Sequence, residues 1–590
     1  MDASAGRDAV ERPVACEGGG AWGSDVVAGM LRALGYKYVA LNPGASFRGL
    51  HDSLVNHNGN ATPQMLLCLH EGNAVALAHG WAKVTGEPMA IILHSNVGLL
   101  HGSMGLFNAW CDRVPMLVLG ATGPVDAARR RPWIDWLHTA QDQGALVRHF
   151  IKWDNQPASV PAAVEALTRA DAITRTAPSG PVYVNLDAAL QEQKLDRLPP
   201  LPDLARFQRP DPAAPSAAGV ARATAMLRVA NAPVILAGRI SRRPEDWARR
   251  VAFAEHLGAR VITDLKVGAA FPTAHPLHAG APGFFLDAPA AEALRQADLV
   301  LSLDWLDLAG TLRQAGEVAA RIIQISLDHL LHNGFGMEHQ ALPMADLHLA
   351  CAPDAGLHAI ADAMGIEAGT PPLDRPASPA LPMPSGDTPL DIGSLAAALG
   401  EGLAGVTTCL VRLPLGWRGD AWHFDHPLDF LGYDGGAGIG SGPGMLVGAA
   451  LALQGSGRMA VAVLGDGDTM MSASALWTAA HYRVPMLAVV ANNRSFFNDE
   501  VHQERVARER QRPVENKWIG QHIGDPDIDL AGIARAQGLA GLGPVAAAGE
   551  LAATVRDAVR LVQDGASVLI DARVQPGYNP AMAAGLTRQS

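Results

Sequence analysis

Two short polar segments, each directly after an apolar run, contain the residues of this sequence best suited to chemistry. Gly465-Asp466-Gly467 follows the apolar run 459–464, and Asn492-Asn493 follows the apolar run 485–491. Both runs predict buried strands, and parallel strands end at the same edge of an α/β sheet, where ligands bind. Carboxylate and amide oxygens suit Mg²⁺ that holds a diphosphate, and a helix N-terminus beside them favours the phosphate charge. Alone, each segment is also a common turn or strand-end signal.

The chain repeats itself at an offset of 370 residues. Residues 113–121 (RVPMLVLGA) match residues 483–491 (RVPMLAVVA) without a gap. Internal similarity of this kind predicts two domains with one topology. The copies differ where chemistry would be: Gly-Asp-Gly occurs only in the second, and Glu71 of the first corresponds to Ser441 of the second. One copy is therefore expected to hold the metal and the diphosphate.

The composition limits the function classes. A chain of 590 residues is too long for one core, so three domains are expected. A net charge of −12 argues against non-specific nucleic-acid binding. The sequence contains no uninterrupted apolar run of about 18 residues, so no membrane span is expected. The five scattered cysteines and the polar start predict a cytoplasmic protein with reduced thiols.

Two proline-rich segments, 198–215 and 369–389, read as linkers. The expected organisation is a disordered start (1–20), a first domain (21–195), a middle Rossmann-like domain (216–366), a third domain (390–575) and a C-terminal tail (576–590). Short Val/Ile/Leu strands alternate with Ala-rich helices in each domain. The predicted fold class is therefore three parallel-sheet α/β domains, of which the first and third are duplicated.

Further candidates lie at strand ends of the first copy. Asn42-Pro43-Gly44 is a tight turn after a strand. Glu71 starts an Ala-rich helix, where a carboxylate can also serve only the helix N-terminus. His94 closes the next strand, where it can be a structural hydrogen-bonder or a proton-transfer group.

The spacing of 24 residues between Gly-Asp-Gly and Asn-Asn resembles the thiamine diphosphate-binding motif. In motif order nearly the whole chain resembles the thiamine diphosphate-dependent decarboxylase and acetolactate synthase-like superfamily. The local sequence motifs are most similar to those of benzoylformate decarboxylase-like enzymes. The resemblance implies thiamine diphosphate (thiamine pyrophosphate) and Mg²⁺ as cofactors, and a carbon–carbon lyase, decarboxylase or carboligase. Its substrate would be a 2-oxo acid or acyloin-type small molecule that reacts through a thiazolium carbanion. It also implies a homodimer, or a dimer of dimers (homotetramer), with sites where the first, pyrimidine-binding domain meets the third, diphosphate-binding domain.

The resemblance assigns site residues by position. The metal ligands would be Asp466, Asn493 and the carbonyl of Ser495. The catalytic residues would be Glu71, which bonds the aminopyrimidine, with His94, Glu500 and His502. The residues that bind the cofactor would be Asn42, Pro43, Gly44, Glu71, Gly465, Asp466, Gly467, Asp468 and Asn493, with Ile439 or Met445 as the apolar residue that bends it. Pro443 occupies the usual place of that residue.

The sequence departs from the benzoylformate decarboxylase-like pattern in two ways. Ala45 stands where those enzymes carry Ser after the Asn-Pro-Gly turn, and Ser46 comes next. The second histidine that those enzymes take from the middle domain has no clear counterpart.

Alternatives remain open. Four arginines (505, 508, 510 and 512) could bind the phosphates of a coenzyme A tail, which with Glu500 would favour a 2-hydroxyacyl-CoA lyase. Alternatively, these arginines form a solvated helix face. A non-catalytic relative would be expected to lack Glu71 or Asp466, and both are present. Whether the middle domain binds FAD, ADP or neither is undecided, because residues 237–240 (AGRI) lack the second glycine of a dinucleotide fingerprint.

Overall fold

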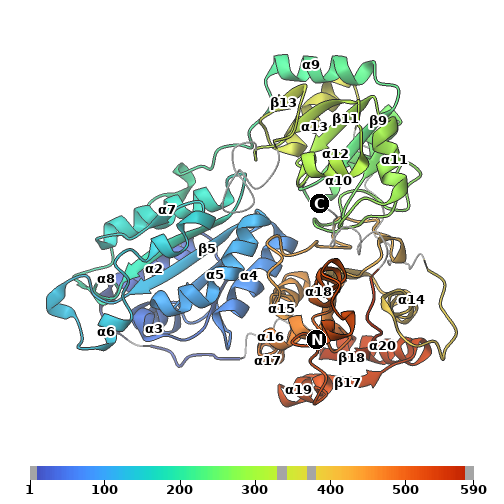
Figure 1. Cartoon of the computed structure of the whole chain (residues 1–590). Coiled ribbons are helices and arrows are strands. Elements are labelled where there is room, and N and C mark those ends of the chain that lie inside the picture. Colours follow the sequence, from blue (N-terminus) through green and yellow to red (C-terminus); the bar gives the residue numbers. More distant parts are fainter. Residues whose placement is uncertain (1–9, 17, 329–341, 368–380, 579–590) are drawn as a thin grey trace.

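The computed structural model describes residues 10–16, 18–328, 342–367 and 381–578, which form three lobes (Figure 1). The first lobe is built on a six-stranded parallel sheet of order β3-β2-β4-β5-β7-β6. Its strands are β2 (Tyr38–Leu41), β3 (Gln64–Leu67), β4 (Met89–Leu93), β5 (Met116–Thr122), β6 (Asp154–Asn155) and β7 (Pro181–Asp187). Its main helices are α2 (Gly23–Ala33), α4 (Glu71–Thr85), α5 (Ser95–Cys111) and α7 (Val160–Arg175). Strands β1 (Ala21–Trp22) and β8 (Lys194–Leu195) pair antiparallel beside the sheet.

The middle lobe contains a five-stranded parallel sheet of order β10-β9-β11-β12-β13, with a separate apolar cluster on each face. Its strands are β9 (Pro233–Ala237), β10 (Arg260–Ile262), β11 (Leu299–Leu303), β12 (Arg321–Ile325) and β13 (Leu347–Leu349). Its helices are α9 (Ala217–Arg228), α10 (Pro244–Leu257), α11 (Ala288–Gln296), α12 (Leu308–Ala315) and α13 (Pro353–Met364).

The third lobe contains a five-stranded parallel sheet of order β14-β15-β16-β18-β17. Its strands are β14 (Thr408–Arg412), β15 (Met459–Gly465), β16 (Met486–Asn492), β17 (Ala540–Val545) and β18 (Ser567–Arg573). Its helices are α14 (Ile392–Gly402), α15 (Gly442–Leu453), α16 (Asp466–Met471), α17 (Ala475–His481), α18 (Phe497–Glu509), α19 (Leu530–Ala536) and α20 (Ala548–Gln563).

The first and third domains share one topology, as the internal repeat predicts. Strands β14, β15 and β16 begin 370 residues after β2, β4 and β5. The order β2-β4-β5-β7-β6 corresponds to β14-β15-β16-β18-β17, while β3 has no counterpart in the third sheet. The likeness extends to backbone conformation, because Arg113 and Arg483 both adopt a left-handed φ, of 58° and 52°. The predicted fold class is confirmed.

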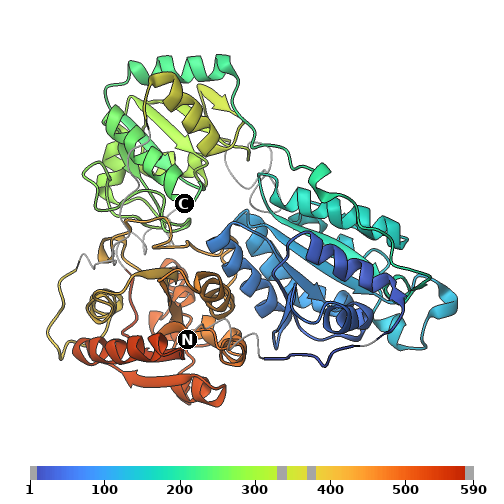
Figure 2. The same ribbon diagram turned by 180° about the vertical axis from the view of Figure 1, so that it is seen from behind.

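Helices α4 and α15, which occupy equivalent places in the two copies, pack against each other where the first and third domains meet (Figures 1 and 2). Glycines allow a very close approach. A Cβ at Gly448 would lie 1.8 Å from the carbonyl oxygen of Leu77, and one at Gly80 would lie 2.0 Å from the carbonyl oxygen of Met445. At these positions the backbone of one helix therefore packs directly against the backbone of the other.

All three domains meet at the C-terminal end of α4. The buried Lys83 ammonium donates to Asp112 of the first domain at 2.5 Å and to the carbonyl of Tyr433 in the third. Arg242 of the middle domain donates to the Lys83 carbonyl. Burial lowers the pKa of Lys83, and the neighbouring Asp112 carboxylate opposes that shift. This network ties the domains together at one point.

Two helices follow β15: the short α16 begins at Asp466, and α17 begins at Ala475. Helix α15 starts at Gly442, because Pro443 is well suited to a first helical turn. None of the helices in the described ranges has the length and apolar character of a membrane span.

Both chain ends were predicted to be tails. Of the start, residues 1–9 and 17 lie outside the described residues, whereas Glu11 accepts a hydrogen bond from the Tyr482 hydroxyl at 2.8 Å. Of the C-terminal tail, residues 579–590 lie outside the described residues, and the Tyr578 ring stands edge-on to Phe497. Two residues assigned to tails thus contact the third domain.

Candidate active site

Asp466 is the first residue of α16, directly after β15, as the sequence predicts. Its side chain is 4% exposed, and one carboxylate oxygen, Oδ1, accepts from the Gly467 N–H at 2.9 Å. The other oxygen, Oδ2, is buried without a hydrogen-bond partner among the described residues. Burial raises the pKa of Asp466, and backbone N–H groups of Gly467, Arg494 and Ser495 partly oppose the shift. A buried carboxylate oxygen without a hydrogen-bond partner is suited to bind a cation, which would compensate for the missing partner.

Asn493 follows β16, next to β15 in the sheet, and its Oδ1 accepts from the Ser495 N–H at 2.9 Å. The Ser495 hydroxyl donates to the carboxylate of Glu500, which lies in the first turn of α18 and is 8% exposed. The Ser495 hydroxyl therefore holds the Glu500 carboxylate in place. His502, one turn along α18, is partly exposed and lines none of the cavities described below.

A cavity of about 490 Å³ opens at this sheet edge. Its lining includes Gly465, Asp466, Gly467, Asp468, Asn493 and Ser495, with Arg412, Tyr433, Ile439 and Tyr578. All the lining residues belong to the third domain and the segment after β18. The predicted metal ligands are thus brought to one cavity, which Glu500 and His502 do not line.

The glycine-rich segment 435–444 forms one wall of the cavity. Asp468 Oδ1 accepts from the Gly440 N–H at 2.5 Å and fixes this segment to α16. Of the two apolar candidates, Ile439 lines the cavity and is 40% exposed. Met445 is fully buried in the packing of α15 on α4, because it stands one turn inside the helix. Only Ile439 is placed to touch a bound molecule.

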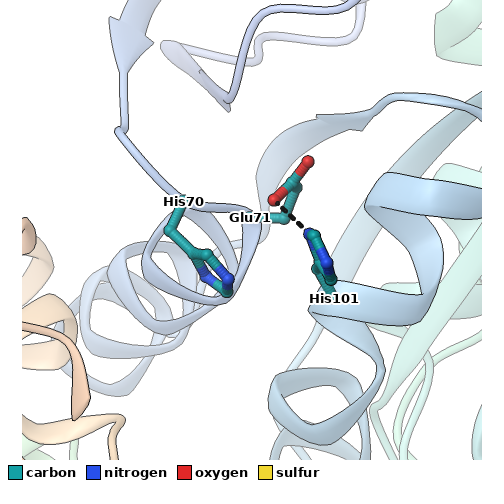
Figure 3. A group of neighbouring side chains, drawn as sticks. All are labelled: His70, Glu71 and His101. Carbon is teal, nitrogen blue, oxygen red and sulfur yellow. Dashed lines mark hydrogen bonds and ion pairs between the residues drawn. The ribbon is translucent and has the colours of Figure 1, made fainter.

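Glu71 starts α4 in the first domain, and its side chain is 7% exposed. Figure 3 shows its carboxylate directed at His101 of α5, with an Oε2–Nδ1 distance of 3.1 Å, while His70 lies on the other side. The His101 side chain is 54% exposed. Ligand atoms of the three residues lie within 4.8 Å of one another. The carboxylate is therefore buried beside a half-exposed histidine.

His94 occupies the N-cap of α5 at the end of β4, and its Nδ1 lies 2.8 Å from the Ser46 hydroxyl. The loop after β5 brings His138 to it, with ring centroids 4.7 Å apart and planes at 73°. Burial lowers the pKa of His94, and the nearby His138 lowers it further. His138 could not be predicted from the sequence, because no spacing relates this loop residue to His94.

The Asn-Pro-Gly turn supports this histidine. The Asn42 amide donates to the carbonyl of Cys68 at 2.9 Å and joins the ends of β2 and β3. A Cβ at Gly44 would lie 2.3 Å from the Cβ of His94. Glycine at 44 and serine at 46 therefore place the His94 ring, whereas Ala45 contributes no polar group.

The arginine run lies on and after α18. Arg508 pairs with Glu504 at 2.6 Å, one helical turn away. Arg510 and Arg512 line a separate surface cavity of about 450 Å³ with Lys517. Between the first and middle domains, a cavity of about 760 Å³ lies at the ends of β9, β11 and β12. Arg239 there is bound to Asp304 and Asp328.

Duplicated α/β domains, a Rossmann-like domain between them and a polar cavity at the strand ends of the third domain define an enzyme of the thiamine-dependent class. Models of three domains of one protein family match successive parts of the chain. Residues 21–146 match the N-terminal TPP-binding domain of thiamine pyrophosphate enzymes, residues 220–333 the central domain and residues 415–572 the C-terminal TPP-binding domain. The chain therefore belongs to the thiamine pyrophosphate enzyme family.

Individual relatives show the range of this similarity. Sulfoacetaldehyde acetyltransferase of Rhodobacter capsulatus is 32% identical over 237 residues, which cover 40% of this chain and 38% of that protein. Benzoylformate decarboxylase of Pseudomonas aeruginosa is 26% identical and covers 73% of this chain and 79% of its own. The solved structure of benzoylformate decarboxylase from Polynucleobacter necessarius has the same fold, with a TM-score of 0.75 at 21% identity over 95% of this chain and 99% of that one. Relatives of this chain within the family thus include sulfoacetaldehyde acetyltransferases, a benzoylformate decarboxylase and acetolactate synthases.

Proposed function

We propose that this protein is a Mg²⁺-dependent carbon–carbon lyase or carboligase that acts on a 2-oxo acid or acyloin-type substrate. The observation that carries the metal assignment is the buried, unpartnered Oδ2 of Asp466 at the cavity edge. Asp466, Asn493 and the Ser495 carbonyl would hold the metal and, through it, the diphosphate. When bound, thiamine diphosphate supplies a carbon nucleophile and an electron sink.

Glu71 would bond the cofactor aminopyrimidine. A carboxylate that is 7% exposed offers a strong acceptor in a low-dielectric place. His101 Nδ1 lies 3.1 Å from that carboxylate, and the His101 ring is half exposed. His101 would therefore lie beside the bound aminopyrimidine.

His94 would transfer the proton to or from the substrate. Its lowered pKa keeps the imidazole neutral near pH 7, which is the form that accepts a proton. Ser46 engages Nδ1 and leaves Nε2 for the transfer. His138 would take the place of the second histidine, from the first domain rather than the middle one.

The site would be completed by a second copy of the chain. The Glu71 group lies on the first domain, while every residue that lines the Asp466 cavity belongs to the third domain and its tail. Apolar side chains are exposed beside both: Leu69, Val97, Leu100 and Met104 near Glu71, and Ile439 and Met471 near Asp466. Patches of this kind mark protein interfaces. A homodimer with two sites, alone or doubled into a tetramer, would cover both patches.

A 2-hydroxyacyl-CoA lyase is the second candidate, because Arg510, Arg512 and Lys517 gather around one cavity. A coenzyme A tail carries phosphates that such side chains bind. Replacing Arg510 and Arg512 with Ala should then raise KM for an acyl-CoA substrate and spare kcat. Unchanged kinetics on the best substrate would favour the 2-oxo acid. Glu500→Gln is expected to lower kcat if that residue transfers a proton, although it is held against Ser495.

Two measurements test the proposal. Calorimetric titration with thiamine diphosphate and Mg²⁺ should show tight binding to the wild type and none to Asp466→Ala, and equal affinity would refute the metal assignment. A panel of 2-oxo acids and acyl-CoA thioesters, read by mass spectrometry, should identify the bond that breaks. We place the protein in the cytoplasm because all five cysteines are free thiols, four of them buried.

A further inference from the structure

Arg412 lines the same cavity as the proposed metal ligands. It is the last residue of β14, which pairs with β15 and so ends at the same edge as Asp466. Its side chain is 3% exposed, and it lines the 490 Å³ cavity. Among the cavity's lining residues, all of them described, Arg412 alone carries positive charge, whereas three carry carboxylates: Asp466, Asp468 and Asp499.

The guanidinium of Arg412 is fixed in place. Its Nη1 lies 2.7 Å from Asp434 Oδ2, and its central carbon lies 3.8 Å from the ring centroid of Tyr433. Asp434 is itself held by the Ser441 hydroxyl at 2.7 Å. A guanidinium has five N–H donors, and contacts with one carboxylate and one ring face do not use all of them. The remaining N–H groups can donate to another acceptor. The group is therefore both immobilised and able to bind an anion.

The neighbouring residues offer no substitute. The segment after Arg412 on the cavity wall reads Leu413-Pro414-Leu415-Gly416, which contains no side-chain hydrogen-bond donor. A diphosphate carries more negative charge than one Mg²⁺ neutralises. On this wall, only the guanidinium can meet the remaining charge with a side chain.

We propose that Arg412 binds the cofactor's diphosphate directly, as a fixed cation in the cavity that the proposed metal ligands also line. This inference rests on the proposed function, since it assumes that the diphosphate enters this cavity. A guanidinium presents two parallel N–H groups that match phosphate oxygens, which a flexible ammonium does not. Asp434 and Tyr433 hold that fork in the cavity before the ligand arrives.

A purely structural role predicts a different outcome, and the same domain supplies the matched control. Arg458 and Asp429 form a buried pair at 2.9 Å, with side chains 3% and 2% exposed. Arg412 and Asp434 have 3% and 0% exposure, but only Arg412 lines the cavity. Breaking either pair leaves a buried carboxylate and should destabilise the domain similarly.

The experiment compares Arg412→Gln, Arg412→Lys and Arg458→Gln by calorimetric titration with thiamine diphosphate and Mg²⁺, with inorganic diphosphate and Mg²⁺, and with thiamine alone. Arg412→Gln should weaken binding of both diphosphates by about 10- to 100-fold, the range of a charge-assisted hydrogen bond, and leave thiamine binding unchanged. Arg412→Lys should weaken binding by a smaller factor. Arg458→Gln should lower the melting temperature but not the diphosphate affinity.

Equal diphosphate affinity in wild type and Arg412→Gln would overturn the inference, as would an equal loss in Arg458→Gln. If Arg412→Gln does not fold, Arg412→Lys decides, and wild-type affinity in that variant overturns the bidentate contact. A wild-type protein that binds neither diphosphate would instead refute the proposed function itself.

Discussion

Glu71 is buried, yet its one described side-chain partner is a half-exposed histidine. We expect Glu71→Gln to keep cofactor affinity, because the amide preserves the shape, and to lose turnover by on the order of 10² or more, because it lacks the charge. The check is a calorimetric titration beside single-turnover kinetics. Normal exchange of the thiazolium proton in Glu71→Gln, measured by NMR, would contradict this role.

The pair of His94 and His138 makes a pH prediction. If neutral His94 accepts the proton, kcat/KM should fall as pH falls through a midpoint below the usual 6.5, because burial and His138 lower its pKa. His138→Gln removes the second cause and should move that midpoint upward. The control is His57→Gln, an exposed histidine of the same domain. An unmoved midpoint in His138→Gln would show that His94 does not set the acid limb.

Single residues could be predicted where they follow a strand. Asp466, Asn493, Glu71 and His94 lie where the sequence placed them because each directly follows a buried strand or starts the next helix. Contacts between separate loops could not be predicted in this way. His138 and Tyr578 reach their places through tertiary packing, which no local pattern records. The burial of Met445 depends on how far α15 extends toward its N-terminus.

At the scale of elements, the contact of α4 with α15 depends on glycine. In an open helix Gly→Ala stabilises by up to about 1 kcal/mol. At Gly448 the new Cβ would meet the Leu77 carbonyl oxygen at 1.8 Å, so Gly448→Ala should destabilise the protein by about 1–3 kcal/mol through overpacking. Gly29→Ala in α2, whose nearest contact is Leu201 Cδ1 at 3.7 Å, is the control and should be neutral or stabilising. Thermal unfolding of both variants measures the difference, and equal melting temperatures would refute the tight packing.

Strands were easier to predict than helix starts. The short Val/Ile/Leu runs expected to form strands do so in β2, β4, β9, β11 and β12, because such runs in a parallel sheet have few alternative registers. Helix α16 was not predicted as a helix, because glycines flank Asp466 and weaken any helical signal. No side chain caps its start, and Asp468 instead joins the helix to Gly440.

At the scale of the whole molecule, the proposed shared site can be tested by mixing two inactive variants. Glu71→Gln damages the first domain and Asp466→Ala damages the third. If each site takes these domains from different chains, a mixed dimer has one intact site, and random reassociation should restore roughly a quarter of the wild-type activity. Reassociated single variants are the control. No recovery, with mixed dimers demonstrated by native mass spectrometry, would place each site within one chain.

The duplicated domains were evident from the sequence, but their direct contact was not. A repeat reports that two units share a topology, and it does not report which faces meet. The glycines on α4 and α15 could have been read as helix-weakening residues alone. Their use in domain packing becomes evident only when the two helices lie side by side (Figure 2).

That contact joins segments that leave the ribosome far apart in time. Helix α4 is complete at Thr85, whereas α15 begins at Gly442. At about 5–20 residues per second, the ribosome needs roughly 20–70 s to make the intervening chain. Throughout this interval the covered face of α4 has no partner within the nascent polypeptide. Ala76 and Gly80 on that face present little apolar area during this interval, whereas Leu77 and Trp81 stay exposed until α15 is made.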